Sequence, residues 1–281
     1  MGGAAALHRV PNRPIVVAAG LDARRAARLI DALRDRATLR TAPSIAALHA
    51  SLNESREPVD VVVIPARDDS GRDVADFVRE LAAAWPRMAI VVYCEIVSAE
   101  APDIRALAVA GAHQFVFAGV DDSALTLRGI LDSARREVAS EFLMLQLATV
   151  LPSELHPLAE RVLARPDVVT TVPALAAALG VHRKTVFNRC ARAGSLTPGE
   201  LVTWIRLVMV AYLLETTGRT VERIAMDLGF ASDTSLRNLL KRYSGYRAGD
   251  IRESGGGRLV MDALAARTRA QPQDQPYSSI S

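Results

Sequence analysis

Short apolar runs alternate with amphipathic segments along the first half of the chain. The clearest run is Asp60–Ile64 (DVVVI), a β-branched stretch typical of a parallel strand that is covered on both faces. Further strands are predicted at 14–19, 39–41, 89–93 and 114–117, and helices at 22–36, 44–52, 72–85, 101–110 and 121–136. Strands that alternate with helices predict a doubly wound parallel sheet with right-handed crossovers.

The order of five strand–helix pairs within this segment predicts a flavodoxin-like (βα)5 fold of the α/β class. The last helix is expected to run on towards Leu151, because 137–151 contains neither glycine nor proline, and to end at Pro152. Two interpretations of 138–151 stay open. The segment is either the seam of a dimer or an apolar helix that packs on its own domain.

Two stretches of the second half repeat one pattern, Ala176–Gly194 and Ala225–Gly245. Each has an alanine, a Leu-Gly pair, a short turn, a basic and polar helix, and a final glycine. The second turn needs one extra residue for the helices to align. The aligned pairs are then Val186 with Leu236, Cys190 with Leu240, and Asn188 with Asn238. This is the layout of a helix-turn-helix, and its duplication predicts a protein that reads two neighbouring DNA segments.

The outer face of each second helix carries groups suited to base edges. Arg or Lys bonds to guanine, Asn pairs with adenine, and an apolar group contacts the thymine methyl. The expected base-reading residues are Arg183, Lys184, Phe187 and Asn188 in the first copy and Asp233, Thr234, Arg237 and Asn238 in the second. The expected phosphate contacts are Lys241, Arg242, Arg247 and Arg252, which position the protein without specifying sequence. For Phe187, partial burial in the core stays open, and for His182 we favour a solvent-facing cap over a base contact.

A long helix is predicted between the copies, from Pro198 to Thr217, with one apolar stripe along it. The stripe residues are Leu201, Ile205, Val208 and Tyr212. Thr171 and Thr220 are the expected N-caps of the first helix in each copy, and Ser232 is the expected N-cap of the second helix in the second copy. A spacer of ~20 residues spans about 30 Å, close to the ~34 Å of one DNA helical repeat.

Charge is distributed unevenly along the chain. The formal net charge is only +3, but residues 171–252 hold 12 Lys and Arg against 6 Asp and Glu, which favours a polyanionic partner for this half. Cys94 and Cys190 fit no metal or redox spacing and are expected to be buried thiols. No metal or cofactor is expected. No apolar run approaches the ~20 residues of a membrane span, so we expect a soluble cytoplasmic protein that makes no membrane contact.

Several motifs of the second half resemble the DNA-binding domain of the AraC/XylS family, over about Leu155–Arg252. They are Ala-Leu-Gly-Val, Arg-Lys-Thr-Val, Trp-Ile-Arg-Leu, Thr-Val-Glu-Arg-Ile-Ala-Met-Asp-Leu-Gly-Phe and Tyr-Ser-Gly-Tyr. The resemblance implies a seven-helix, two-motif transcription regulator that binds promoter double-stranded DNA, with RNA polymerase as a further partner. We also expect a homodimer. The departures are Ala231 for a polar residue, Leu236 and Leu240 for aromatics, and Ala248 for a proline.

The first half resembles response-regulator receiver domains through its (βα)5 order, Asp60–Ile64 and the Gly-Ala-His-Gln-Phe run from Gly111. Phosphoryl transfer there needs an acidic pair, a nucleophilic aspartate, a hydroxyl and a lysine. The corresponding positions here are Ala18, Ala19 and Gly20, then Pro65, Cys94 and Ala118. We therefore expect a pseudo-receiver without phosphorylation. Asp68 and Asp69 are expected in a solvated turn rather than a metal site.

The sequence thus favours a sequence-specific transcription regulator with a non-phosphorylatable receiver-like domain. The alternative is a small-molecule sensor with a ligand at the carboxyl edge of the sheet. An enzyme is not expected, because no phosphate-cradling glycine loop or nucleophile–base pair is present. The predicted domains are a flexible leader (1–13), the receiver-like domain (14–137), a connector helix (138–152), the DNA-binding domain (153–252) and a mostly disordered tail (253–281).

Overall fold

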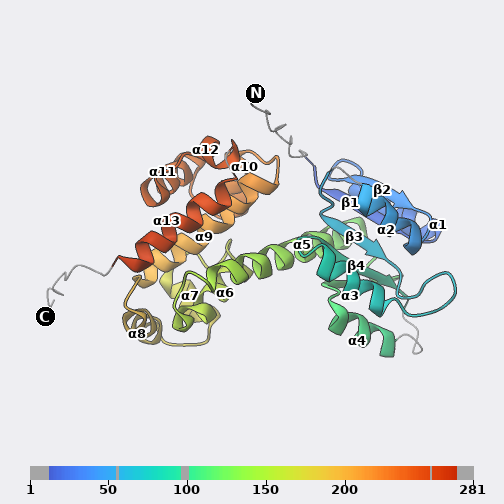
Figure 1. The fold of residues 1–281 in the computed structure, drawn as a ribbon, viewed down its shortest axis with the longest axis horizontal. Coiled ribbons are helices and arrows are strands. Elements are labelled where there is room, and N and C mark those ends of the chain that lie inside the picture. Colours follow the sequence, from blue (N-terminus) through green and yellow to red (C-terminus); the bar gives the residue numbers. More distant parts are fainter. Residues whose placement is uncertain (1–12, 55–56, 96–100, 254, 271–281) are drawn as a thin grey trace, which may run out of the picture. The chain divides into compact units, whose positions relative to one another are not determined.

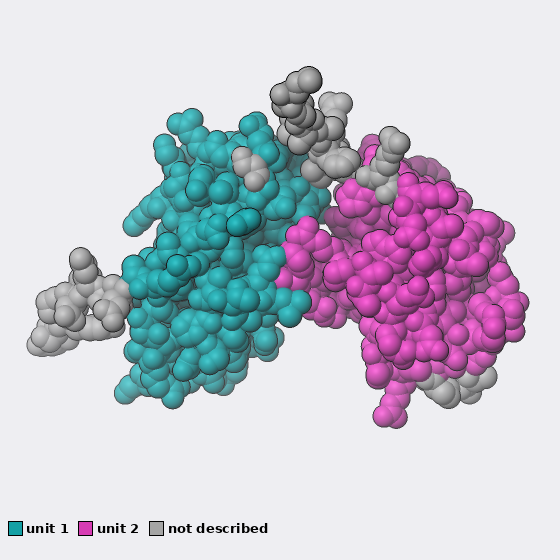
Figure 2. Space-filling view, viewed as in Figure 1, with its two compact units in different colours: residues 1–10, 143–281 teal, residues 11–142 magenta. Residues whose placement is uncertain are grey.

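The computed structural model describes residues 13–54, 57–95, 101–253 and 255–270. It divides into two compact units, one of residues 11–142 and one of residues 1–10 with 143–281 (Figure 2). We call them the sheet unit and the helical unit, and each is treated by itself. The predicted leader falls almost entirely outside the described residues.

The sheet unit is built on a five-stranded parallel sheet with the order β2-β1-β3-β4-β5 (Figure 1). Its strands are β1 (Ile15–Ala19), β2 (Thr38–Ala42), β3 (Val61–Ile64), β4 (Ala89–Cys94) and β5 (Gln114–Phe117). This is the flavodoxin-like order, and it confirms the predicted fold class.

The apolar character of β1, β3 and β4 follows from burial on both faces of the sheet, since alternate side chains enter two separate cores. One core joins the strands to α2 (Ile45–Glu54), α3 (Ala75–Ala84) and α4 (Ala101–Ala110). The other joins them to α1 (Ala23–Leu33) and α5 (Ala124–Leu147).

Helix α5 extends beyond the predicted end of the receiver-like domain at residue 137 and ends at Leu147, short of the expected Leu151. Val138 packs into the core that α1 and α5 share, as the second interpretation of this segment requires. Leu143 and Leu147 are also buried. A dimer seam along this helix stays a prediction.

The helical unit contains, within described residues 153–253, the seven helices that the family resemblance implies. They are α6 (His156–Ala164), α7 (Val172–Ala178), α8 (Arg183–Ala193), α9 (Pro198–Thr216), α10 (Val221–Asp227), α11 (Asp233–Ser244) and α12 (Ala248–Glu253). A short 3-10 helix, η2 (Ser153–Leu155), precedes α6.

Helix α9 is the axis of this unit, and its burial exceeds the single predicted stripe. Residues on every side of it are buried, including Val202, Trp204 and Val210 as well as Leu201. The reason is that α6, α7, α10, α12 and α13 all pack around it. Tyr212, expected within the stripe, is only half-buried.

The predicted tail from residue 253 is wrong for residues 256–269, which form helix α13 (Gly256–Arg269). Its Gly-rich start resembles a linker, but four apolar residues at helical spacing follow and are buried: Val260, Met261, Leu264 and Ala265. Burial of this stripe stabilises the helix and offsets the cost of the two glycines at its start. Residues 271–281 of the predicted tail lie outside the described residues.

The turns inside the two repeats are built on glycines with similar left-handed backbones, Gly180 at φ +65° and Gly229 at φ +66°. Their surroundings differ. A Cβ on Gly180 would meet no atom within 4 Å, whereas a Cβ on Gly229 would lie 2.9 Å from the Asp167 carbonyl oxygen. The second turn is therefore enclosed by the chain that precedes α7, and the first is open.

We predict that Gly180→Ala lowers the unfolding free energy of the helical unit by about 1–2 kcal/mol, the backbone cost of a left-handed alanine. Gly229→Ala should lose about 1–3 kcal/mol more, because the backbone around Asp167 must move. The measurement is urea unfolding in a Trp85→Phe background, in which Trp204 becomes the only tryptophan and reports this unit. Equal losses for the two alanines would contradict the enclosed second turn.

Candidate nucleic-acid interface

The two repeats superpose in sequence as predicted, with the extra residue in the second turn. Helix α7 begins at Val172 and α10 at Val221, an offset of 49, whereas α8 begins at Arg183 and α11 at Asp233, an offset of 50. The additional residue therefore lies between the helices of the second pair. Each pair has the helix, glycine turn and second helix of a helix-turn-helix.

Side-chain caps start all four helices of the repeats and confirm the expected N-caps. Thr171 and Thr220 accept hydrogen bonds from the amides of Ala174 and Arg223. Ser232 accepts the amide of Ser235 at 3.0 Å. These bonds satisfy amides that have no partner within the helix.

His182 is the cap of α8, as the favoured interpretation has it. Its Nδ1 accepts the Lys184 amide at 3.2 Å. The predicted base-reading residues follow His182 in the helix.

The inner faces of α8 and α11 are buried at equivalent positions. Val186, Leu236 and Leu240 are fully enclosed, and Cys190 is 3% exposed. Burial raises the pKa of the Cys190 thiol to about 11, so this cysteine stays protonated and packs as a small apolar group. The leucines thus fill the core positions at which the family has aromatics.

The outer face of α8 carries the whole predicted base-reading set of the first copy. Arg183, Lys184 and Asn188 are exposed, and the Phe187 ring is 47% exposed. About half of Phe187 is therefore covered, so the residue is not fully buried, and partial burial stays open beside base contact. The face combines two cations, an amide and an apolar ring.

On the outer face of α11, two of the predicted base-reading side chains already interact with a third. Thr234, Arg237 and Asn238 are exposed, and Asp233 is half-buried. The Arg237 Nε lies 3.4 Å from the Asp233 carboxylate one turn earlier, and the Thr234 hydroxyl lies 3.4 Å from the other carboxylate oxygen. The Asp233 carboxylate thus interacts with both the Thr234 hydroxyl and the Arg237 guanidinium. Arg237 would have to break its ion pair before it could contact a base.

The four predicted phosphate contacts are all exposed at the end of the second copy. Lys241 and Arg242 lie in the last turn of α11. Arg247 precedes α12, and its amide donates to Asp250 at 2.8 Å. Arg252 is engaged within the protein, because its guanidinium donates to the Arg219 carbonyl oxygen.

Sequence reasoning missed Arg206, the buried cation of α9. Its Nε donates to the Pro166 carbonyl at 3.0 Å and its Nη2 to the Leu228 carbonyl at 2.6 Å. The guanidinium also lies 4.0 Å from the centre of the Phe230 ring. Burial lowers the pKa of Arg206, but an arginine stays charged at neutral pH, so two carbonyls and a ring face solvate it.

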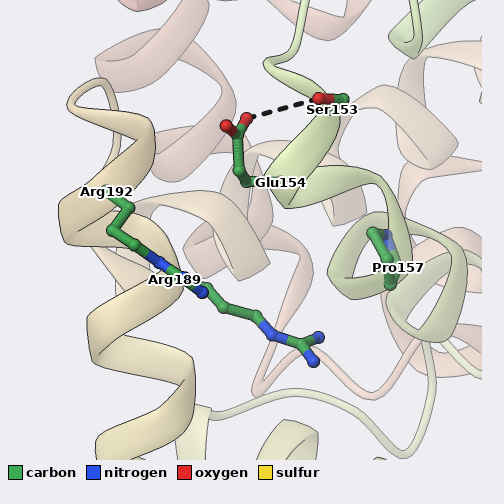
Figure 3. Close-up of a pocket in the computed structure, with 5 residues that line it drawn as sticks. All are labelled: Ser153, Glu154, Pro157, Arg189 and Arg192. Atoms are coloured by element: carbon green, nitrogen blue, oxygen red, sulfur yellow. Dashed lines mark hydrogen bonds between the residues drawn. The ribbon is translucent and has the colours of Figure 1, made fainter.

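A pocket of about 360 Å³ lies between α8 and the segment that includes η2, and it too was not anticipated. Figure 3 shows Arg189 and Arg192 on α8 facing Ser153, Glu154 and Pro157. The Ser153 hydroxyl donates to Glu154 at 3.4 Å. None of its five lining residues belongs to the predicted DNA-contact set.

The carboxyl edge of the sheet is packed with small and apolar groups. Ala18, Ala19 and Pro65 are buried, and the Pro65 ring lies 3.5 Å from where a Gly20 Cβ would be. The Cys94 thiol donates to the Val116 carbonyl at 3.6 Å. The residues at the expected receiver positions therefore offer no carboxylate here.

The two aspartates that follow β3, Asp68 and Asp69, form part of a turn. Asp68 accepts the amides of Ser70 and Arg72 and pairs with the Arg72 guanidinium at 2.9 Å. The Arg72 amide, with its guanidinium and the Ser70 amide, holds the pKa of Asp68 below its usual value against partial desolvation. Asp69 is exposed, which fits the favoured solvated turn.

Among the described residues, no three His, Cys, Asp or Glu side chains are grouped so that they could hold a metal ion. Within the same ranges, no single helix has the length and apolar character needed to cross a membrane. The pair α8 and α9, which meet at an 81° bend, reaches that threshold only together.

Both repeats lie within a segment that matches a known protein family. Residues 175–254 match the family model of a helix-turn-helix domain. The HTH-type transcriptional regulator MtrA of Neisseria gonorrhoeae is 29% identical over 99 residues, which are 35% of this chain. The chain matches 33% of the length of that protein.

Solved structures resemble parts of the chain more remotely. A response regulator receiver domain protein from Clostridium thermocellum is 17% identical, with a TM-score of 0.39, covering 44% of this chain and 95% of its own. Full-length FixJ from B. japonicum is 15% identical, with a TM-score of 0.37, covering 78% and 98%. At these low scores the receiver-like fold rests on the strand order of the sheet unit.

The repeat offset, the caps, the buried and exposed faces and the family match all concern the same segment. The chain carries an AraC-type helix-turn-helix domain in its helical unit.

Proposed function

We propose that this protein is a sequence-specific transcription regulator in which α8 and α11 read successive major-groove segments of double-stranded DNA. The observation that carries the proposal is the pairing of two equivalent capped helices, each with a buried apolar face and an exposed polar one. An exposed helix of this kind fits the major groove, and phosphate contacts flank it.

The roles of the residues follow from their chemistry and exposure. Arg183, Lys184, Phe187 and Asn188 contact bases from α8, and Asp233, Thr234, Arg237 and Asn238 do so from α11. Lys241, Arg242, Arg247 and Arg252 contact phosphates. In this assignment α8 supplies more of the specificity, because its outer face carries no acidic residue.

The sheet unit acts, in this proposal, as a receiver-like domain that regulates without phosphorylation. Its support is the buried Ala18, Ala19 and Pro65 at the positions where a receiver needs its acidic pair and nucleophile. Regulation then proceeds through contact with a partner or a second copy of the chain. A cytoplasmic homodimer that meets RNA polymerase at a promoter is the setting that the proposal implies.

The base-reading assignment predicts different effects for two exposed residues. The probe is the duplex most enriched from a randomised library by the full-length chain, compared with a scrambled duplex. Asn188→Ala should lose about 1–3 kcal/mol of discrimination between them, because an amide that pairs with adenine is removed. Arg242→Ala should weaken both duplexes alike and reduce the salt slope by about one.

Titrations at several salt concentrations check both variants against the wild type. Equal weakening of both duplexes by Asn188→Ala would remove this residue from base reading. If the wild type enriches no duplex at all, the proposal of a DNA-reading protein fails.

The receiver-like assignment predicts no phosphorylation of the full-length chain by acetyl phosphate with Mg²⁺. In the part of the chain that the structure describes, the packed edge around Pro65 offers neither a nucleophilic carboxylate at the expected position nor a metal site. Intact-mass spectrometry is the measurement, with a phosphorylatable receiver domain treated in parallel. A mass increase of one phosphoryl group on a single aspartate would overturn this assignment.

A further inference from the structure

Helix α13 begins after residue 254, where the match to the helix-turn-helix family model ends. It runs antiparallel along α9, with its first turn near the end of α9 and its last turn near the start (Figure 1). Its inner side chains Val260 and Leu264 are fully buried. The helix is therefore an integral part of the helical unit.

The first turn of α13 is attached to the end of α9 from which the second motif continues. The Gly257 amide donates to the Glu215 carboxylate at 2.9 Å. An amide at a helix N-terminus has no partner within its own helix, and a carboxylate is the acceptor that the helix dipole favours.

The last turn of α13 is attached to the junction between α8 and α9. Arg267 donates to the Glu200 carboxylate from Nη2 at 2.7 Å and from Nε at 3.2 Å. Its Nη1 donates to the Ser195 carbonyl at 3.2 Å. One guanidinium thus joins the chain just after α8 to the first turn of α9.

Glu200 is the other half of this attachment. It forms a capping box with Thr197, whose amide and hydroxyl both donate to its carboxylate. Partial burial acts to raise the pKa of Glu200, but the Thr197 donors and Arg267 outweigh it and lower the pKa overall. The carboxylate is therefore ionised, and its pair with Arg267 is a charge-assisted one.

The junction decides where α8 points. Only residues 194–197 separate the two helices, which meet at 81°. Ser195 and Leu196 are buried within this segment. A hydrogen bond to the Ser195 carbonyl therefore restrains the backbone that sets the direction of the first reading helix.

The second reading helix is attached to α9 by residues of α9 itself. Trp204 meets Tyr243 of α11 edge to face, with ring centres 5.3 Å apart. Arg206 bonds the Leu228 carbonyl in the turn before α11. In the first motif, by contrast, the junction with α9 depends on a side chain from α13.

We infer that Arg267 is a positioning residue that sets the orientation of α8 relative to α11, and thereby the separation of the two DNA segments that the protein reads. The inference rests on the proposed function. It assigns to α13 a part in DNA specificity without a DNA contact.

The test varies the separation of the two segments. The probe is the enriched duplex, compared with the same duplex carrying one extra base pair between its two contacted segments, as mapped by footprinting. One base pair moves the segments apart by about 3.4 Å and rotates them by about a tenth of a turn. The wild type should bind the lengthened duplex at least about tenfold more weakly, and Arg267→Ala should reduce that ratio about threefold or more.

Three matched variants separate positioning from charge and stability. Arg269→Ala removes the same charge from an exposed site two residues away and should leave the ratio unchanged. Arg267→Lys keeps the charge but cannot bridge both acceptors with a planar fork, so an intermediate ratio is expected. Glu200→Gln removes the ion pair from the opposite side and should reduce the ratio as Arg267→Ala does.

Unfolding followed by Trp204 fluorescence in the Trp85→Phe background shows which variants are folded at the assay temperature. A folded Arg267→Ala protein with the wild-type ratio, or with both duplexes weakened equally, overturns the inference while leaving the proposed function intact. If Arg267→Ala is unfolded, Glu200→Gln decides by the same criterion. A wild type that enriches no duplex removes the proposed function and the inference with it.

Discussion

A single buried guanidinium connects the two halves of the DNA-binding domain. Arg206 bonds the Pro166 carbonyl, which precedes the first motif, and the Leu228 carbonyl, which lies in the turn of the second. Both acceptors would otherwise be buried beside apolar neighbours, and the cation would have no counterpart. The enclosed Gly229 follows from the same arrangement, because the chain at Asp167 is drawn against the second turn. One buried side chain therefore connects the segment before the first motif to the turn of the second.

Local patterns predicted most of this architecture, and the failures share one cause. Apolar periodicity gave the five strands, and cap chemistry gave Thr171, Thr220, His182 and Ser232. The sequence did not single out Arg206, because its acceptors lie 40 and 22 residues away along the chain. The Gly-rich start of residues 256–269 predicts a disordered tail. The apolar stripe that follows stabilises a helix only when it packs against α9, which the local sequence does not reveal. Both misses concern contacts between distant segments, which spacing within one segment does not reveal.

The sheet unit has the strand order of a receiver domain, but not the residues that phosphoryl transfer needs at the expected positions. Its parallel strands need alternate apolar residues for two cores, and every strand of the sheet supplies them. The reactive positions of a receiver lie at the carboxyl ends of the strands, and here Ala18, Ala19 and Cys94 at those ends pack into the two cores. Small residues and Pro65 can therefore replace them without loss of the sheet. For this reason the strand order identifies the architecture, and only the individual edge residues bear on phosphorylation.

The two motifs have the same layout, but they are attached to α9 in different ways. This difference bears on how each would contribute to DNA binding. The second is fixed to α9 through Trp204, Arg206 and an enclosed glycine turn, and its Arg237 is paired with Asp233. An exposed ion pair of this kind contributes about 0–1 kcal/mol, so Arg237 can leave it for DNA at small cost. The first motif has an open turn, an outer face free of acidic residues, and a junction held from outside by Arg267. In the proposed function, a second motif fixed to α9 anchors the protein and Arg267 of α13 sets the direction of the first, so we expect base reading to depend most on the orientation of α8.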